Sequence, residues 1–346
     1  MRKEVLWAIV AGVILGLIVA FGVYRINSSI SPKNHNGSEP SPTPASNIGE
    51  FKVVLDKPEN DDVVTGSTVT VSGLTHGASW VTLSGESGDY TIQADSSGAF
   101  SQDVDLIPGV NQIKVTAFEA SGAQSATEVL VVYSSSFETR TLPTGTPNAN
   151  ASGTADIRAK IAQDVANTLS RPKAYIGTVT DITDSTIQIK NAASEIEQIS
   201  INADSTAVVN STTSISKNVK TTDIAIGDFI VAMGYIDANS VLDAQRILIT
   251  TAVSEPKIAV NEAKVVSATK KSLTVSVLPN NSEDTVLPDV NTDIEAIVSG
   301  ASKSARFNYV VTGDMIIYVV TTDSKGVETV RSIFDLTPPP PPTPKG

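Results

Sequence analysis

The sequence predicts a mainly β protein with an N-terminal transmembrane helix, a β-sandwich, one linker helix and two tandem small β-barrels. Three observations lead to this fold class. An uncharged apolar run lies near the N-terminus, which is typical of a membrane helix. Short runs of alternating apolar and polar residues follow, and glycines separate them. Two stretches of the C-terminal half repeat each other at a constant offset.

The apolar run covers Val5–Tyr24, which are 20 residues without a charge. At a rise of about 1.5 Å per residue, a helix of this length spans about 30 Å, the thickness of a bilayer core. Trp7 and Tyr24 lie near its ends, where interfacial aromatic residues are common. A cleaved signal peptide is the alternative, but its apolar region would be shorter. We therefore expect residues 5–24 to contact membrane lipid.

This anchor predicts a single-pass plasma-membrane protein whose C-terminal region is extracytoplasmic, because Arg2 and Lys3 favour a cytoplasmic N-terminus. Small residues recur every fourth position of the helix and form one stripe where a second helix could approach. The stripe is a candidate helix–helix face for self-association, and it consists of Ala8, Gly12, Gly16 and Ala20.

Composition shifts divide the chain into seven segments. Polar stretches rich in proline and serine cannot build a core, so they indicate a stalk, a linker and a tail. We expect a cytoplasmic tip and anchor at 1–26, a stalk at 27–50 and a β-sandwich at 51–134. A linker at 135–172 contains a helix at 154–169. Two barrel domains cover 173–252 and 253–336, and a proline-rich tail covers 337–346.

Six runs in the first folded region have the length and alternation of strands. They are Phe51–Leu55, Val69–Ser72, Trp80–Leu83, Tyr90–Ala94, Asn111–Phe118 and Thr127–Tyr133. The segments 71–75, 94–100 and 106–117 resemble bacterial Ig-like domains, in which an Asp-x-x-Gly-x-Phe turn precedes a Leu…Gly-x-Asn-x-Ile strand. The resemblance implies an Ig-like β-sandwich. Such modules serve as spacers or adhesion units and share no common active site.

Two features of this region leave alternatives open. Val81 and Leu83 take the inward phase of their strand. Trp80 therefore either packs in the core or at an edge, or faces outward as a contact for a ligand. The acidic residues between Asp56 and Asp62 either form a solvated turn or supply part of a calcium site, which needs about 6–8 oxygen ligands. The sequence does not decide whether calcium binds there.

The C-terminal half contains a tandem repeat with an offset of 86 residues. The segment 177–189 aligns with 263–275, and Gly227-Asp228 aligns with Gly313-Asp314. An offset that holds along the whole region indicates two copies of one domain. Both copies resemble OB-like β domains of unassigned function in exported bacterial proteins. Asp228 and Asp314 are best interpreted as turn residues that bind their own backbone.

Composition excludes several classes of function. The chain of 346 residues has a net charge of −12, no cysteine and two histidines. An acidic surface does not favour phosphate backbones, so we expect no nucleic-acid partner. No catalytic motif, metal-ligand set or cofactor-binding loop is present in the sequence. The sequence therefore predicts no enzyme, no catalytic residues, no cofactor and no metal.

These observations predict a membrane-anchored, extracytoplasmic, non-enzymatic bacterial protein for adhesion, envelope scaffolding or partner display. Its partner would be an unidentified protein or glycan. The alternative is a cell-surface receptor for glycans or other ligands that uses Trp80 of the Ig-like module as its contact. The oligomeric state does not follow from the sequence.

Overall fold

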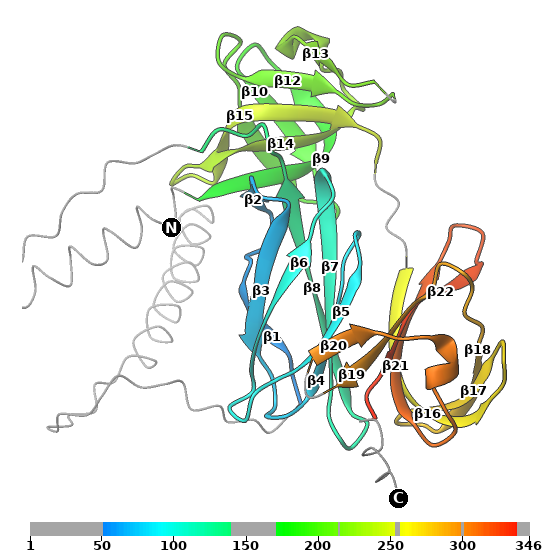
Figure 1. Ribbon diagram of the computed structural model, residues 1–346. Helices are drawn as coiled ribbons and strands as arrows, with labels where there is room; N and C mark the ends of the chain where they lie inside the picture. Colours follow the sequence, from blue (N-terminus) through cyan, green and yellow to red (C-terminus); the bar gives the residue numbers. More distant parts are fainter. Residues whose placement is uncertain (1–50, 140–170, 214, 253–256, 299–300, 338–346) are drawn as a thin grey trace, which may run out of the picture. The chain divides into compact units, whose positions relative to one another are not determined.

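The computed structural model describes residues 51–139, 171–213, 215–252, 257–298 and 301–337 (Figure 1). Within these ranges the chain forms β-strands and two short 3-10 turns, with no α-helix. The strands belong to three sheets. We name three parts: the first β unit (residues 51–139), the first repeat (171–252) and the second repeat (257–337).

The first β unit has two facing sheets whose side chains enclose one core. Strands β1 (Val54–Lys57), β3 (Thr68–Leu74) and β6 (Ala99–Asp105) form one sheet. The other contains β2 (Asp62–Val64), β4 (Trp80–Ser84), β5 (Asp89–Gln93), β7 (Gly109–Phe118) and β8 (Gln124–Tyr133). All six strands predicted in this region are present, and their inward residues Val81, Leu83, Ile113 and Val115 are fully buried. β2 and β6 were not predicted.

The first repeat contains β9 (Pro172–Ile182), β10 (Thr186–Lys190), β11 (Ile196–Ser200), β12 (Ala207–Asn210), β13 (Lys217–Val219), β14 (Phe229–Ile236) and β15 (Val241–Thr250). β15 runs parallel to β11 and β12 and antiparallel to β14. Alternate residues of these strands, including Ile187, Ile199 and Ile230, form a buried core because side chains of a strand point to opposite faces.

The second repeat contains β16 (Lys257–Ala268), β17 (Leu273–Val277), β18 (Ser282–Val286), β19 (Asp293–Val298), β20 (Ala301–Ser304), β21 (Met315–Thr322) and β22 (Glu328–Asp335). Its seven strands follow the order of the first repeat, and the two 3-10 turns, Thr221–Asp223 and Phe307–Tyr309, lie 86 residues apart. The tandem repeat is therefore confirmed. The predicted turn role of Asp228 and Asp314 is confirmed too, because Asp228 Oδ2 accepts from Ala225 N and Asp314 Oδ2 from Val311 N.

The predicted pair of separate OB-like barrels is wrong. In the second repeat the strand order β18-β17-β16-β21-β22-β19-β20 is an open seven-stranded sheet, since β18 has no pairing beyond β17. Four of the five residues of β18 are exposed, so this strand has no apolar row that would seal a closed ring. The strands of the first repeat belong to one twelve-stranded sheet that continues into the first β unit through β2.

The predicted transmembrane helix and the single-pass localisation are also contradicted. Among the residues that the structure describes, none belongs to a helix with the length and apolarity that crossing a bilayer requires. The segments on which the helix predictions rested, 5–24 and 154–169, lie outside the described residues, as do the stalk at 27–50 and the small-residue stripe of Ala8, Gly12, Gly16 and Ala20.

Candidate functional site

Backbone pairing joins the first β unit to the first repeat. β2 runs parallel to β8 on one side, with Asp62 opposite Val131, and meets β9 on the other, with Asp62 opposite Lys173. The Ala174 amide donates to the Asp61 carbonyl at 2.8 Å. A short strand between two longer ones thus satisfies backbone groups of both parts. We call this contact, together with the side chains around it, the first junction.

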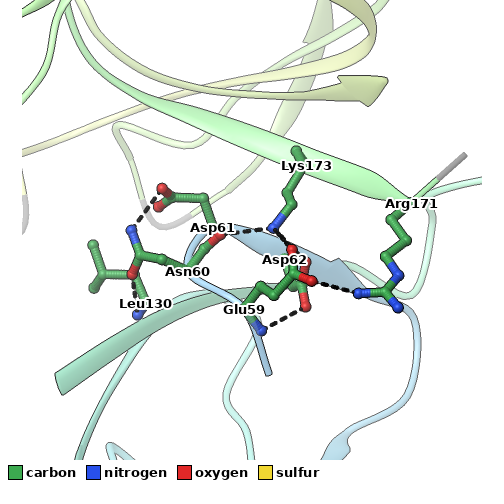
Figure 2. Close-up of polar contacts among 7 residues, drawn as sticks. All are labelled: Glu59, Asn60, Asp61, Asp62, Leu130, Arg171 and Lys173. Atoms are coloured by element: carbon green, nitrogen blue, oxygen red, sulfur yellow. Dashed lines mark hydrogen bonds and ion pairs between the residues drawn. The ribbon is translucent and has the colours of Figure 1, made fainter. Parts of the chain in front are cut away.

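Four of the charged side chains around this pairing form ion pairs (Figure 2). Lys173 Nζ lies 2.8 Å from Asp62 Oδ1 and 3.0 Å from Glu59 Oε2, and Arg171 donates to Glu59 Oε1 at 2.6 Å. The hydrogen bond from Lys173 is the main reason why the pKa of Glu59 lies below its usual value. Lys173 also donates to the Asn60 carbonyl, which holds its ammonium over the turn.

These contacts show what the acidic turn between Asp56 and Asp62 does in the structure. Two of its carboxylates, Glu59 and Asp62, pair with cations that come from the first repeat. Asn60 donates to the carboxylate of Asp61, and burial raises the pKa of that residue. In the described ranges no three His, Cys, Asp or Glu side chains are grouped as metal ligands. The turn therefore acts as one half of an ion-paired contact.

Apolar side chains complete the first junction. Val231, Met233 and Tyr235 of β14 point away from the core of their own repeat and belong to a second buried cluster. The first β unit supplies Val63, Val132 and Phe137 to this cluster. The rings of Phe137 and Tyr235 lie 6.2 Å apart, within the range in which aromatic pairs attract.

The second repeat contacts the first β unit through the equivalent strand. Ile317 and Val319 of β21 lie 86 residues after Val231 and Met233 and are fully buried in a cluster that also contains Phe118 of β7. Trp80 is half-buried and packs against the same cluster. This tryptophan therefore faces away from the core of its own unit and towards the second repeat. We call this contact the second junction.

Two polar side chains of the second junction, those of Asp89 and Ser332, are deeply buried. The Asp89 side chain is 1% exposed, and Arg331 lies 3.2 Å from its Oδ1 and donates to the Gly85 carbonyl at 2.7 Å. The Ser332 hydroxyl donates to the other carboxylate oxygen. Burial raises the pKa of Asp89, and the positive charge of Arg331 opposes this shift. Lys114 of β7 donates to the Ile258 carbonyl at 2.8 Å.

Sequence reasoning missed both junctions, although a signal was present. The runs 229–236 and 315–320 are apolar at nearly every position. A strand with one solvated face alternates, whereas a strand that is buried on both faces is continuously apolar. In both repeats alternate residues of this strand enter the repeat's own core, and the others enter a junction.

Glu262 is a buried carboxylate at the second junction, and its ionisation is expected to make stability depend on pH. It lies on β16 in phase with Ile258 and Val260, is 6% exposed, and its Oε2 has no hydrogen-bond partner among the described residues. Burial raises its pKa from 4.5 to about 6. The folded state therefore holds this proton more tightly than the unfolded chain, and the penalty for ionised Glu262 develops as pH rises from 4.5 to about 6.

We expect Glu262→Gln to stabilise the protein by roughly 1–2 kcal/mol at pH 7 and to leave stability unchanged at pH 4. Urea denaturation of the wild type and the variant across this range measures the difference. Glu283→Gln, which removes an exposed carboxylate from β18, is the control. If the wild type and Glu262→Gln differ in free energy of unfolding by the same amount at both pH values, Glu262 does not have the raised pKa.

Comparisons with known proteins place this chain in no family, because neither a family model nor a curated protein matches it. Three solved structures illustrate the similarities that were found. A tetra-tandem repeat in the extending region of a large adhesion protein is 12% identical, with 84% of this chain and 74% of that chain covered and a TM-score of 0.21. Drosophila Unr CSD456 is 10% identical, with 82% and 99% covered and a TM-score of 0.17.

The third is a structure from a 1.5-MDa bacterial ice-binding adhesin, 14% identical, with 83% of this chain and 96% of that chain covered and a TM-score of 0.17. The structures that resemble this chain thus include repeat domains of bacterial adhesins. At such TM-scores the similarity carries no argument about function, so the functional conclusion depends on the chain's own residues.

Proposed function

We propose that this protein is a non-enzymatic, adhesion-type scaffold in which the first β unit holds both repeats in fixed positions. One observation carries the proposal: the corresponding strands of the two repeats, β14 and β21, are buried on both faces. One face of each strand packs in the core of its own repeat, and the other face packs against the first β unit. Domains of one chain move relative to one another by default unless their interface is large and apolar.

The polar contacts support the same conclusion. Each junction combines an apolar cluster with charged groups that require a defined geometry, Lys173 with Asp62 in the first and Arg331 with Asp89 in the second. Partly buried ion pairs lose more when the geometry is disturbed than exposed ones do. Both junctions therefore favour a single arrangement, which is what a protein needs in order to present a partner at a set position.

Distance measurements between spin labels test the proposal. The chain has no cysteine, so two introduced cysteines carry the only labels. Ser101→Cys on β6 and Lys190→Cys on β10 report on the first junction from exposed positions. We expect a single narrow distance distribution in the full chain. Lys173→Ala should broaden it, because Asp62 then loses its cation and Glu59 keeps only Arg171.

Lys264→Ala is the control for loss of one positive charge, since this residue is exposed on the second repeat. It should leave the distribution narrow. A broad distribution in the unaltered protein would refute a fixed arrangement. Turnover of a substrate by the full chain would refute the non-enzymatic assignment.

A further inference from the structure

A groove beside the first junction has the features of a ligand site. It is a cavity of about 490 Å³ between the first β unit and the first repeat. This volume lies within the range of about 300–1,000 Å³ that is usual for ligand pockets, which occur preferentially where domains meet. Its partly exposed aliphatic residues are Val110 and Leu248. We call it the junction groove.

Hydrogen-bonding side chains line the same groove. Five serines take part, Ser134, Ser135, Ser136, Ser211 and Ser216, together with the guanidinium of Arg246 and the carboxylate of Glu86. Arg246 and Ser136 also line a neighbouring cavity of about 560 Å³, so the two cavities meet at these residues. No described carboxylate forms an ion pair with Arg246. A guanidinium beside several hydroxyls favours a ligand that bears a carboxylate, which arginine binds with two parallel hydrogen bonds.

The backbone around the groove argues against a peptide ligand. Extended peptides commonly bind by adding a strand to a free sheet edge. The strands that line the groove have no such edge: β8 lies between β7 and β2, β14 between β9 and β15, and β15 between β14 and the strands β11 and β12. Recognition must therefore come from side-chain hydroxyls, the guanidinium and the aliphatic side chains, which match the hydroxyls, carboxylates and C–H faces of an acidic sugar.

We propose that the junction groove binds a carboxylate-bearing polysaccharide, with the carboxylate of one sugar residue on Arg246 and neighbouring sugar hydroxyls on the serines. The site goes beyond the scaffold role, which requires no ligand. The net charge of −12 means that a polyanion is not attracted to the chain as a whole. Binding would have to be local, and it should weaken as salt screens the contact with Arg246.

Isothermal titration of the full chain with oligogalacturonate tests the proposal, with a neutral dextran of similar length as the comparison. We expect saturable binding of oligogalacturonate and none of dextran. Arg246→Ala should weaken binding at least tenfold, and Arg246→Lys should restore part of it because the charge remains without the two-pronged geometry. Lys303→Ala, an exposed lysine of the second repeat, removes the same charge elsewhere and should have no effect.

Three results would overturn the proposal: no binding of oligogalacturonate, equal binding by the wild type and Arg246→Ala, or tighter binding of an acidic peptide such as oligoglutamate. Thermal unfolding of each variant shows whether it is folded. Because the spin-label distances do not depend on a ligand, failure of this site and failure of the scaffold proposal are distinguishable.

Discussion

Replacement of Arg331 by alanine is expected to lower the free energy of unfolding by about 3 kcal/mol at neutral pH. The reason is the carboxylate that remains. The Asp89 side chain is 1% exposed and has Arg331 as its ion-pair partner across the second junction. Without the guanidinium, a buried charge loses its compensation, and the Gly85 carbonyl loses a donor. Because protonation of Asp89 removes that charge, the loss should shrink as the pH falls.

Urea denaturation followed by the fluorescence of Trp80 measures this loss in a Trp7→Phe background, since Trp80 packs against the second junction. The double variant Asp89→Asn, Arg331→Ala should recover much of the stability, because no buried charge remains. Arg306→Ala removes an exposed arginine from the same repeat and serves as the control. Equal losses for the single and the double variant would show that the ion pair is unimportant.

Replacement of Gly98 by alanine is expected to lower the free energy of unfolding by roughly 4 kcal/mol, which is at the upper end of the range for single substitutions. Gly98 has a φ of +86°, and a Cβ at this position would lie 1.9 Å from the Thr75 carbonyl oxygen. That oxygen belongs to the backbone next to β3, so no side-chain rotation relieves the clash. The same turn depends on Asp95, whose Oδ1 accepts from the amides of Ser97 and Ala99.

Gly109→Ala separates the two causes of this effect. Gly109 has a φ of +102°, yet a Cβ there would meet nothing within 4 Å. Gly109→Ala should therefore lower the free energy of unfolding only through the unfavourable positive φ, by about 1–2 kcal/mol. Denaturation of both variants under identical conditions gives the comparison. If the two substitutions cost the same, the contact with Thr75 does not determine the requirement for glycine.

The proposed scaffold role couples stability to function, because the junctions serve both. Arg331 and Lys173 each link two parts that have cores of their own. A variant that weakens a junction should change the distances between the parts before it unfolds any of them. In the proposed scaffold, such a change would alter the relative positions of the three parts without altering the residues on their surfaces.

Several strands of the first β unit were predictable from the alternation of apolar and polar residues, but β6 was missed although its residues alternate too. Val81, Leu83, Ile113 and Val115 alternate with outward residues, and all four are fully buried. β2 was missed because three residues, Asp62–Val64, are too few to show a period. The repeat was recognised because the local pattern of each strand recurs at a constant offset along the chain. The closure of two barrels did not follow, because closure depends on partners that are distant in the chain.

The candidate site was predictable only in part. The acidic turn at Asp56–Asp62 and the residue Trp80 were recognised as unusual, but their neighbours were not. Lys173 lies more than a hundred residues after Asp62, and the cluster against which Trp80 packs comes mainly from the second repeat. Nothing in a linear pattern relates such residues.

What the sequence by itself determined is local and periodic: the strands, the Asp95–Gly98 turn, the repeat and the shortage of reactive side chains. The tertiary structure decided which strands are buried twice, which carboxylates meet cations and where Arg246 faces a cavity. The physical reason is that alternation records whether a side chain avoids water, which each segment expresses alone. Which surface covers that side chain depends on contacts between segments that are distant in the chain. The hydrophobic effect is non-directional, so many apolar faces could bury the same side chain equally well.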